Sequence, residues 1–289
     1  MFEIQNDLLK IVIAAKGAEL QSVQNLAAGL EYMWSGDEKF WGKKSPVLFP
    51  IVGGLKNNSY THEGKTYQLG RHGFARDRMF TAINHSKDSI TFQLKSDAES
   101  LAVYPFDFIF SITYTLEADK LSCTYSIENP GDKVMYFSVG AHPAFKVPLT
   151  ADTTFTDWHL KFNETEDAPR WPLSTEGLTL LQSEGCITNT NIVPLAKDLF
   201  SSDALVFKNL QSDTIVLASN KSIHGLSMEF RHFPYYGIWS TKNADFVCLE
   251  PWCGIADNVA ATGELKDKEG INSIEPAAVF SRTWSVTFF

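Results

Sequence analysis

A long hairpin of alternating residues constrains this chain more than any other feature. Apolar side chains occupy every second position from Phe108 to Leu116, and serine or threonine fills positions 111, 113 and 115 between them. The alternation resumes from Leu121 to Ile127, after a turn at Ala118-Asp119-Lys120. Successive side chains of a strand point to opposite faces, so each segment has one apolar and one polar face. The pair predicts an antiparallel hairpin with one buried face.

Most other segments also favour strands. The strongest helical signal, Asp97–Val103, is short, and residues 150–203 show the least regular pattern, which predicts long loops there. No repeat or change of composition divides the chain, so we expect one domain over residues 1–289. The sequence predicts an all-β protein, a large antiparallel β-sandwich with few short helices. Besides residues 284–288, the further predicted strands are Leu8–Ala14, Ala18–Val23, Ser89–Leu94, Ala204–Phe207, Thr214–Leu217, Leu226–Phe230 and Phe246–Glu250.

Composition limits the kinds of partner and the cellular compartment that we expect for this chain. The net charge is −9 and no long basic run is present, which argues against nucleic acid or an anionic membrane as the partner. The N-terminus lacks the pattern of a secretory signal, and no apolar run reaches membrane-spanning length. The four cysteines are irregularly spaced, which favours free thiols in a reducing cytoplasm.

Two histidines stand in unusual settings. His142 follows a short strand in which Ser138 and Gly140 share its face, so that face carries little side-chain bulk and leaves room beside the ring. Histidines in apolar strands are more often core residues than functional ones. His72 lies in Gly70-Arg71-His72-Gly73-Phe74, where flanking glycines allow a tight turn, and a solvated loop is the alternative there.

One carboxylate ends an apolar strand. Glu250 shares a strand face with Phe246 and Cys248 and precedes Pro251-Trp252. If that face is buried, desolvation raises the pKa of Glu250 toward the range useful for a base. A carboxylate and one or two histidines suffice to interconvert sugar anomers. A base removes the proton of the C1 hydroxyl, an acid protonates the ring oxygen, and the opened ring recloses on the other face.

Four motifs in this order resemble the aldose 1-epimerase (galactose mutarotase-like) family, and within it the LacX-type branch. They are Pro46–Pro50, His72–Asp77, Gly140–Phe145 and Leu249–Trp252. The resemblance implies a galactose mutarotase-like β-sandwich and a sugar substrate, with no metal or other cofactor. It implies Glu250 as the general base at the C1 hydroxyl, His142 as the acid at the ring oxygen and His72 as a second catalytic histidine.

The resemblance also implies a set of substrate-binding residues. Asp203 matches the family's acceptor for sugar hydroxyls, and Phe74 and Trp252 are the aromatic candidates for sugar contact. The family carries a sugar-binding arginine shortly after the Phe-Pro motif, where this chain has Gly54, and we hypothesise that Arg71 replaces it.

Two alternatives to a free-sugar epimerase remain open. A carbohydrate-binding or sensing protein could keep the pocket with little catalysis, and the glycine at position 54 is compatible with this. A hexose-phosphate 1-epimerase would use Arg71, Arg76 and Arg78 as an anion site. Cys248 and Cys253 lack a second Cys or His pair nearby in sequence, so the sequence does not predict a zinc site. The oligomeric state is not predicted.

Overall fold

The predicted hairpin lies within the largest sheet of the molecule. In the computed structural model, which describes residues 1–289, β9 (Ile109–Glu117) and β10 (Lys120–Glu128) pair in register, with Ile112 opposite Tyr125 and Phe110 opposite Ile127. Their apolar faces are buried, which confirms the hairpin. The sheet has nine antiparallel strands in the order β15 (Glu184–Pro194), β14 (Trp158–Arg170), β17 (Thr214–Ser219), β18 (Ser222–Glu229), β22 (Val279–Phe288), β10 (Lys120–Glu128), β9 (Ile109–Glu117), β8 (Ser89–Lys95) and β7 (Thr81–His85).

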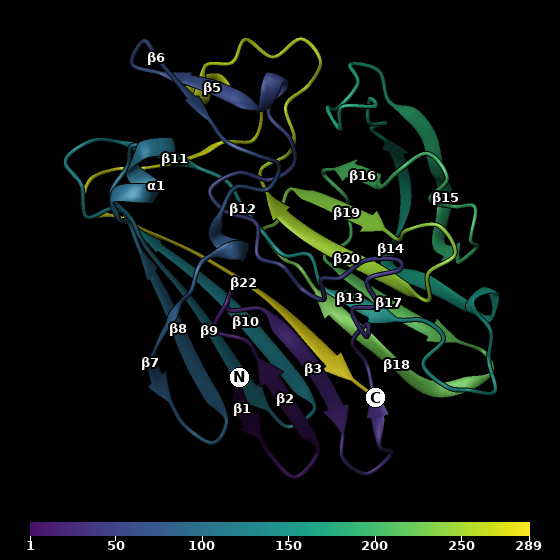
Figure 1. Ribbon diagram of the computed structural model, residues 1–289. Coiled ribbons are helices and arrows are strands. Elements are labelled where there is room, and N and C mark those ends of the chain that lie inside the picture. The colour runs from purple at the N-terminus through teal and green to yellow at the C-terminus, as the bar shows by residue number, and fades with distance from the viewer.

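Two smaller sheets cover the apolar face of this large sheet (Figure 1). Tyr114 of β9 donates a hydrogen bond to the carbonyl of Ala18, which joins the large sheet to the first small sheet. That sheet contains β1 (Phe2–Gln5), β2 (Leu9–Ile13), β3 (Leu20–Asn25) and β4 (Leu30–Glu31). The second contains β12 (Val139–Gly140), β13 (Ala144–Lys146), β16 (Leu205–Lys208), β19 (Tyr235–Trp239) and β20 (Phe246–Cys253).

The layers enclose one extensive apolar core. Tyr236 of β19 reaches Met228 of β18 across the layers, and both residues are buried. The cluster extends from Ile11 of β2 through Phe110 to Phe288 at the chain end. The predicted all-β class with packed antiparallel sheets is therefore confirmed.

The remaining elements are short. The predicted helix is confirmed as α1 (Ala98–Val103), and the Asp97 side chain caps it by accepting from the amide of Ser100. No helix is long and apolar enough to cross a bilayer. The others are strands β5 (Ser59–His62), β6 (Lys65–Gln68), β11 (Met135–Phe137) and β21 (Asn272–Ile274), and 3₁₀ turns η1 (Lys56–Asn58), η2 (Ala75–Asp77), η3 (Phe155–Asp157) and η4 (Leu265–Asp267).

Residues 150–203 are more regular than the sequence predicts. Instead of long loops alone, they include β14 and β15, which pair at the end of the large sheet. The pairing contains register shifts, the buried alternation of β14 is interrupted at Glu164, and only Ile187 and Val193 of β15 are buried. Those irregularities hide the period-two signal on which a strand prediction depends.

Strand β20 also runs further than predicted, through Pro251 to Cys253. Proline has no backbone N–H, yet the carbonyl of Pro251 still accepts from Ala141. The strand therefore lacks one backbone hydrogen-bond donor at Pro251. It still pairs with β12 and β13 on one side and with β19 on the other.

Candidate active site

The register of β20 against the segment around His142 creates the centre of the site. Gly140 pairs with Trp252 and Ala144 pairs with Cys248, so His142 falls opposite Glu250. Side chains that face each other across two strands lie on one face of the sheet. The result is a contact of 3.2 Å between His142 Nε2 and Glu250 Oε2.

The Trp252 indole fills the space that the glycine at position 140 leaves on this face. A Cβ atom at Gly140 would lie 2.6 Å from the Trp252 indole, and one at Gly237 would lie 2.5 Å from its far edge. The two glycines flank β20 on β12 and β19. They therefore make room for the Trp252 ring, which in turn lines a cavity.

His72 reaches the same cavity from a different part of the chain. The Phe-Pro motif joins the two histidine segments, because Leu48 pairs with Gly140 and Phe49 pairs with Gly73. The amide of Gly53 donates to His72 Nδ1 at 3.1 Å. A neutral His72 therefore carries its proton on Nε2 and is a hydrogen-bond donor.

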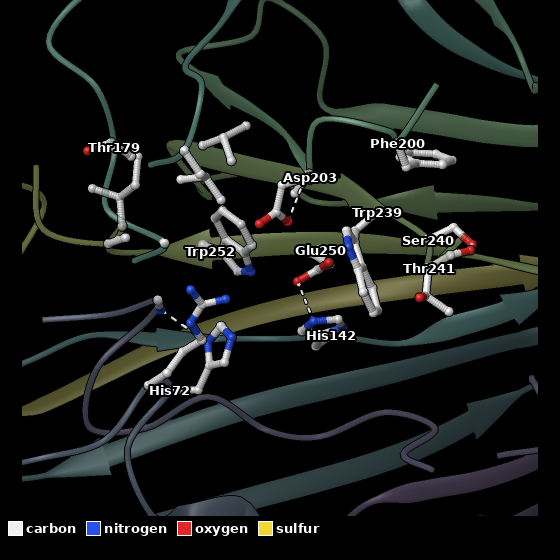
Figure 2. A pocket seen from close by; sticks show the side chains of 18 of the residues that line it. His72, His142, Thr179, Phe200, Asp203, Trp239, Ser240, Thr241, Glu250 and Trp252 are labelled. Atoms are coloured by element: carbon white, nitrogen blue, oxygen red, sulfur yellow. Dashed lines mark hydrogen bonds and ion pairs between the residues drawn. The ribbon is translucent and has the colours of Figure 1, made fainter. Parts of the chain in front are cut away.

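A cavity of about 560 Å³ unites these groups (Figure 2). His72, His142 and Glu250 all line it, and the two histidine rings lie 5.8 Å apart between centroids. Asp203 and Trp252 line it as well. His72 and Asp203 adopt left-handed backbone conformations, with φ of 67° and 75°, which non-glycine residues adopt at a cost.

Two tryptophans that sequence reasoning missed enclose His142. Trp41 stacks on its ring at 5.0 Å between centroids, and Trp239 meets it edge-on at 5.7 Å. Trp41 lies in a segment without regular structure and gives no periodic signal. Trp239 ends β19, whose run of β-forming residues from Tyr235 could have identified the strand.

Burial sets the protonation of the central pair. It lowers the pKa of His142 to about 3, with the charge of Arg76 acting in the same direction. Burial also raises the pKa of Glu250 well above its ordinary value, and the charge of Asp203 adds to this. The direction agrees with the sequence prediction for Glu250. At neutral pH His142 is therefore the neutral imidazole, and Glu250 holds a proton more readily than a carboxylate in water does.

Comparison with known proteins gives the family. The family model described as Aldose 1-epimerase matches residues 1–264. The chain belongs to the aldose 1-epimerase family. Protein LacX of Lactococcus lactis subsp. lactis is 32% identical over 294 residues, which cover 99% of this chain and 98% of LacX.

Solved structures from lactobacilli agree with this assignment to the aldose 1-epimerase family. A galactose mutarotase related enzyme from Lactobacillus acidophilus is 38% identical, with a TM-score of 0.96 over 100% of this chain and 97% of its own. A galactose mutarotase-like protein from Lactobacillus casei is 32% identical, with a TM-score of 0.94 over the full length of both chains.

Not every candidate taken from the aldose 1-epimerase resemblance lies in the cavity. Phe74 is absent from its lining and packs against Phe49, Tyr104 and Phe108 instead, so the structure does not place it with the other candidates. Arg71 and Phe74 flank His72 and Gly73 in the sequence but point to different places, because Gly73 turns the chain with φ of 69°.

Arg71 lines the cavity and lies against the turn at residues 174–179. Its Nη2 donates to the carbonyl of Glu176 at 3.3 Å, and its guanidinium occupies the space that a side chain at Gly177 would need. A Cβ atom at Gly54 would lie 3.6 Å from the carbonyl oxygen of Gly177. A side chain at position 54 and the Arg71 side chain therefore approach the same turn, and the replacement stays a hypothesis.

Proposed function

We propose that this protein is an aldose 1-epimerase that interconverts the α and β anomers of an aldose. The contact between His142 and Glu250 at the cavity wall carries the proposal. The C1 hydroxyl and the ring oxygen of a sugar are bonded to the same carbon. Two side chains in contact can therefore reach both oxygens at once, one as base and one as acid.

In the proposed reaction, Glu250 takes the proton of the C1 hydroxyl while His142 protonates the ring oxygen. The C1–O5 bond breaks, the aldehyde turns about C1–C2, and the reverse transfers close the ring on the other face. Both groups return to their starting states, so no cofactor or co-reactant is consumed.

The step needs one proton on the pair, held by His142. Burial favours the form in which Glu250 holds that proton, so substrate binding has to shift it toward His142 across 3.2 Å. The stacked Trp41 ring favours the transfer, because the face of an indole attracts the imidazolium that forms. The proton that the reaction needs is thus exchanged between Glu250 and His142.

The other cavity groups suit the binding of a polyhydroxyl ligand. His72 offers an Nε2–H donor, and Asp203 offers an acceptor. The buried Nε1 of Trp252 has no hydrogen-bond partner, so it is a further donor available to a sugar oxygen. Sugar rings present donors and acceptors around an apolar ring face, and this mixture matches them.

Polarimetry of freshly dissolved α-D-glucose and α-D-galactose tests the proposal. We expect the wild type to accelerate mutarotation, and Glu250→Gln and His142→Asn each to lose about 100-fold or more. His85→Asn, at an exposed position of β7, is the matched control and should keep full activity. Wild-type rates in both site variants would refute these roles. Sugar binding without any acceleration by the wild type would instead favour a carbohydrate-binding or sensing protein.

A hexose phosphate is the second candidate substrate, favoured by the cations around the cavity. Arg71, Arg76 and Lys242 line it, and the Nε of Arg76 is buried without a hydrogen-bond partner. Arg78 does not belong to this set, because it pairs with Asp97 and Glu99 away from the cavity. Rates on glucose and glucose 6-phosphate, compared in the wild type and Arg76→Gln, decide between the substrates. A preference for the phosphate that disappears in the variant would support the second candidate.

A further inference from the structure

Cys248 lies beside the proposed catalytic pair. No second cysteine or histidine pair follows it in sequence at the spacing of a metal-binding motif. Cys248 is two residues before Glu250 on β20, so both side chains are on one face of the strand. The Cys248 sulfur, a carboxylate oxygen of Glu250 and a ring nitrogen of His142 all lie within 4.8 Å of one another. Three different metal-ligating atoms thus converge on one point.

One of these ligands has an unused polar atom that faces another. Glu250 is 1% exposed, and its Oε2, 3.2 Å from Nε2 of His142, makes no well-aligned hydrogen bond even to that imidazole. Buried polar atoms are normally satisfied, and an orphan at a cavity wall indicates that a ligand completes the site.

We propose that Cys248, His142 and Glu250 bind a zinc ion at the wall of the cavity. An imidazole nitrogen, a thiolate and a carboxylate oxygen are the ligand types that Zn²⁺ selects. Three protein ligands leave the fourth tetrahedral position for a water molecule or a sugar hydroxyl from the cavity side. Thiolate and carboxylate together neutralise the ion, which removes the cost of burying either charge alone.

Coordination requires the thiolate, the carboxylate and a neutral imidazole, so zinc binding releases protons.

Zinc is then an inhibitor of the proposed epimerase, and this consequence rests on the proposed function. The ion occupies the carboxylate oxygen and the ring nitrogen that would exchange protons with the sugar. Metal binding itself does not depend on the proposed function, because it needs only the three side chains.

Metal titration tests the site directly, in a Cys186→Ser background that removes the one exposed thiol. We expect one Zn²⁺ to bind per chain by calorimetry. Cd²⁺ as a probe should produce a sulfur-to-metal charge-transfer band in the ultraviolet. Cys248→Ser, which keeps the side-chain volume, and Cys248→Ala should each weaken Zn²⁺ binding by at least about 100-fold and abolish the band. Cys253→Ala is the matched buried control and should change neither.

The outcomes separate the two proposals. Zn²⁺ binding that is equally tight in both Cys248 variants, or Cd²⁺ binding without the charge-transfer band, overturns the zinc site. Zinc binding by a chain that does not accelerate mutarotation sustains the site and refutes the epimerase. If both hold, micromolar Zn²⁺ suppresses mutarotation by the parent, and the Cys248 variants resist the suppression. Inhibition that persists unchanged in those variants also overturns the zinc site.

Discussion

Adding one methyl group at Gly140 should displace Trp252 and lower activity. Alanine at this position would place its Cβ 2.6 Å from Cδ1 of Trp252 and 3.2 Å from Cγ2 of Val52. Carbon atoms in ordinary contact are about 3.5–4.0 Å apart, so the indole has to move by about 1 Å. It cannot tilt freely, because Gly237 lies under its opposite edge, where a Cβ would be 2.5 Å away.

The expected effect of Gly140→Ala follows from that displacement. Overpacking of a close-packed region costs about 1–3 kcal/mol, which corresponds to a fall in melting temperature of about 2–10 °C. A shift of about 1 Å in a group that positions substrate costs up to about 100-fold in rate. We expect kcat/KM for mutarotation to fall by about 10- to 100-fold, mostly through KM, with a changed tryptophan fluorescence.

Polarimetry and thermal denaturation measure both effects. Gly185→Ala is the matched control, because no atom lies within 4 Å of a Cβ placed there and the residue is on the distant strand β15. Gly237→Ala should reproduce the loss from the other side of the ring. A stable Gly140→Ala variant with wild-type kcat/KM would show that the position of Trp252 does not matter to the reaction.

Three further predictions follow from the site and its supports. First, since the pKa of Glu250 is raised in the folded state, its contribution to stability is complete below the unfolded value near 4.5 and is lost as the pH rises. The free energy of unfolding of Glu250→Gln should therefore exceed that of the wild type by a margin that grows as the pH rises above about 4.5, by at most about 1.4 kcal/mol per pH unit, and an unchanged difference would contradict the assigned shift. Second, Arg71→Ala should raise KM for the sugar by about 10- to 100-fold, while Arg78→Ala leaves it unchanged; equal KM values in both variants would end the hypothesis that Arg71 replaces an arginine at position 54. Third, Lys268 and Asp257 form an ion pair that is almost entirely buried, so Lys268→Met should lower the free energy of unfolding in urea by about 3–5 kcal/mol; a neutral result would mean that the pair is dispensable.

The sequence by itself determined the fold class and most of the candidate site. The alternation from Phe108 to Ile127 specifies a strand pair, because period two is a local property of the chain. The motifs around His72, His142 and Glu250 could likewise be found, because each is a short run of unusual residues. Asp203 and Trp252, taken from the resemblance, line the same cavity as these three.

Tertiary structure alone decided which of these residues contact one another and which other residues contact them. His142 faces Glu250 because β12 and β13 pair with β20 in one particular register, and sequence does not encode register locally. The same pairing brings Cys248 to the two catalytic candidates, whereas sequence spacing offered only Cys253 as its partner.

The aromatic residues divide in the same way. Phe74 stands next to a predicted site residue in sequence, yet after the turn at Gly73 its ring packs against the core. Trp41 is about a hundred residues from His142, yet it stacks on that ring. Local pattern fixes which face of a strand is apolar, but long-range packing decides which aromatic ring covers which polar group, because those contacts join segments that share no periodicity.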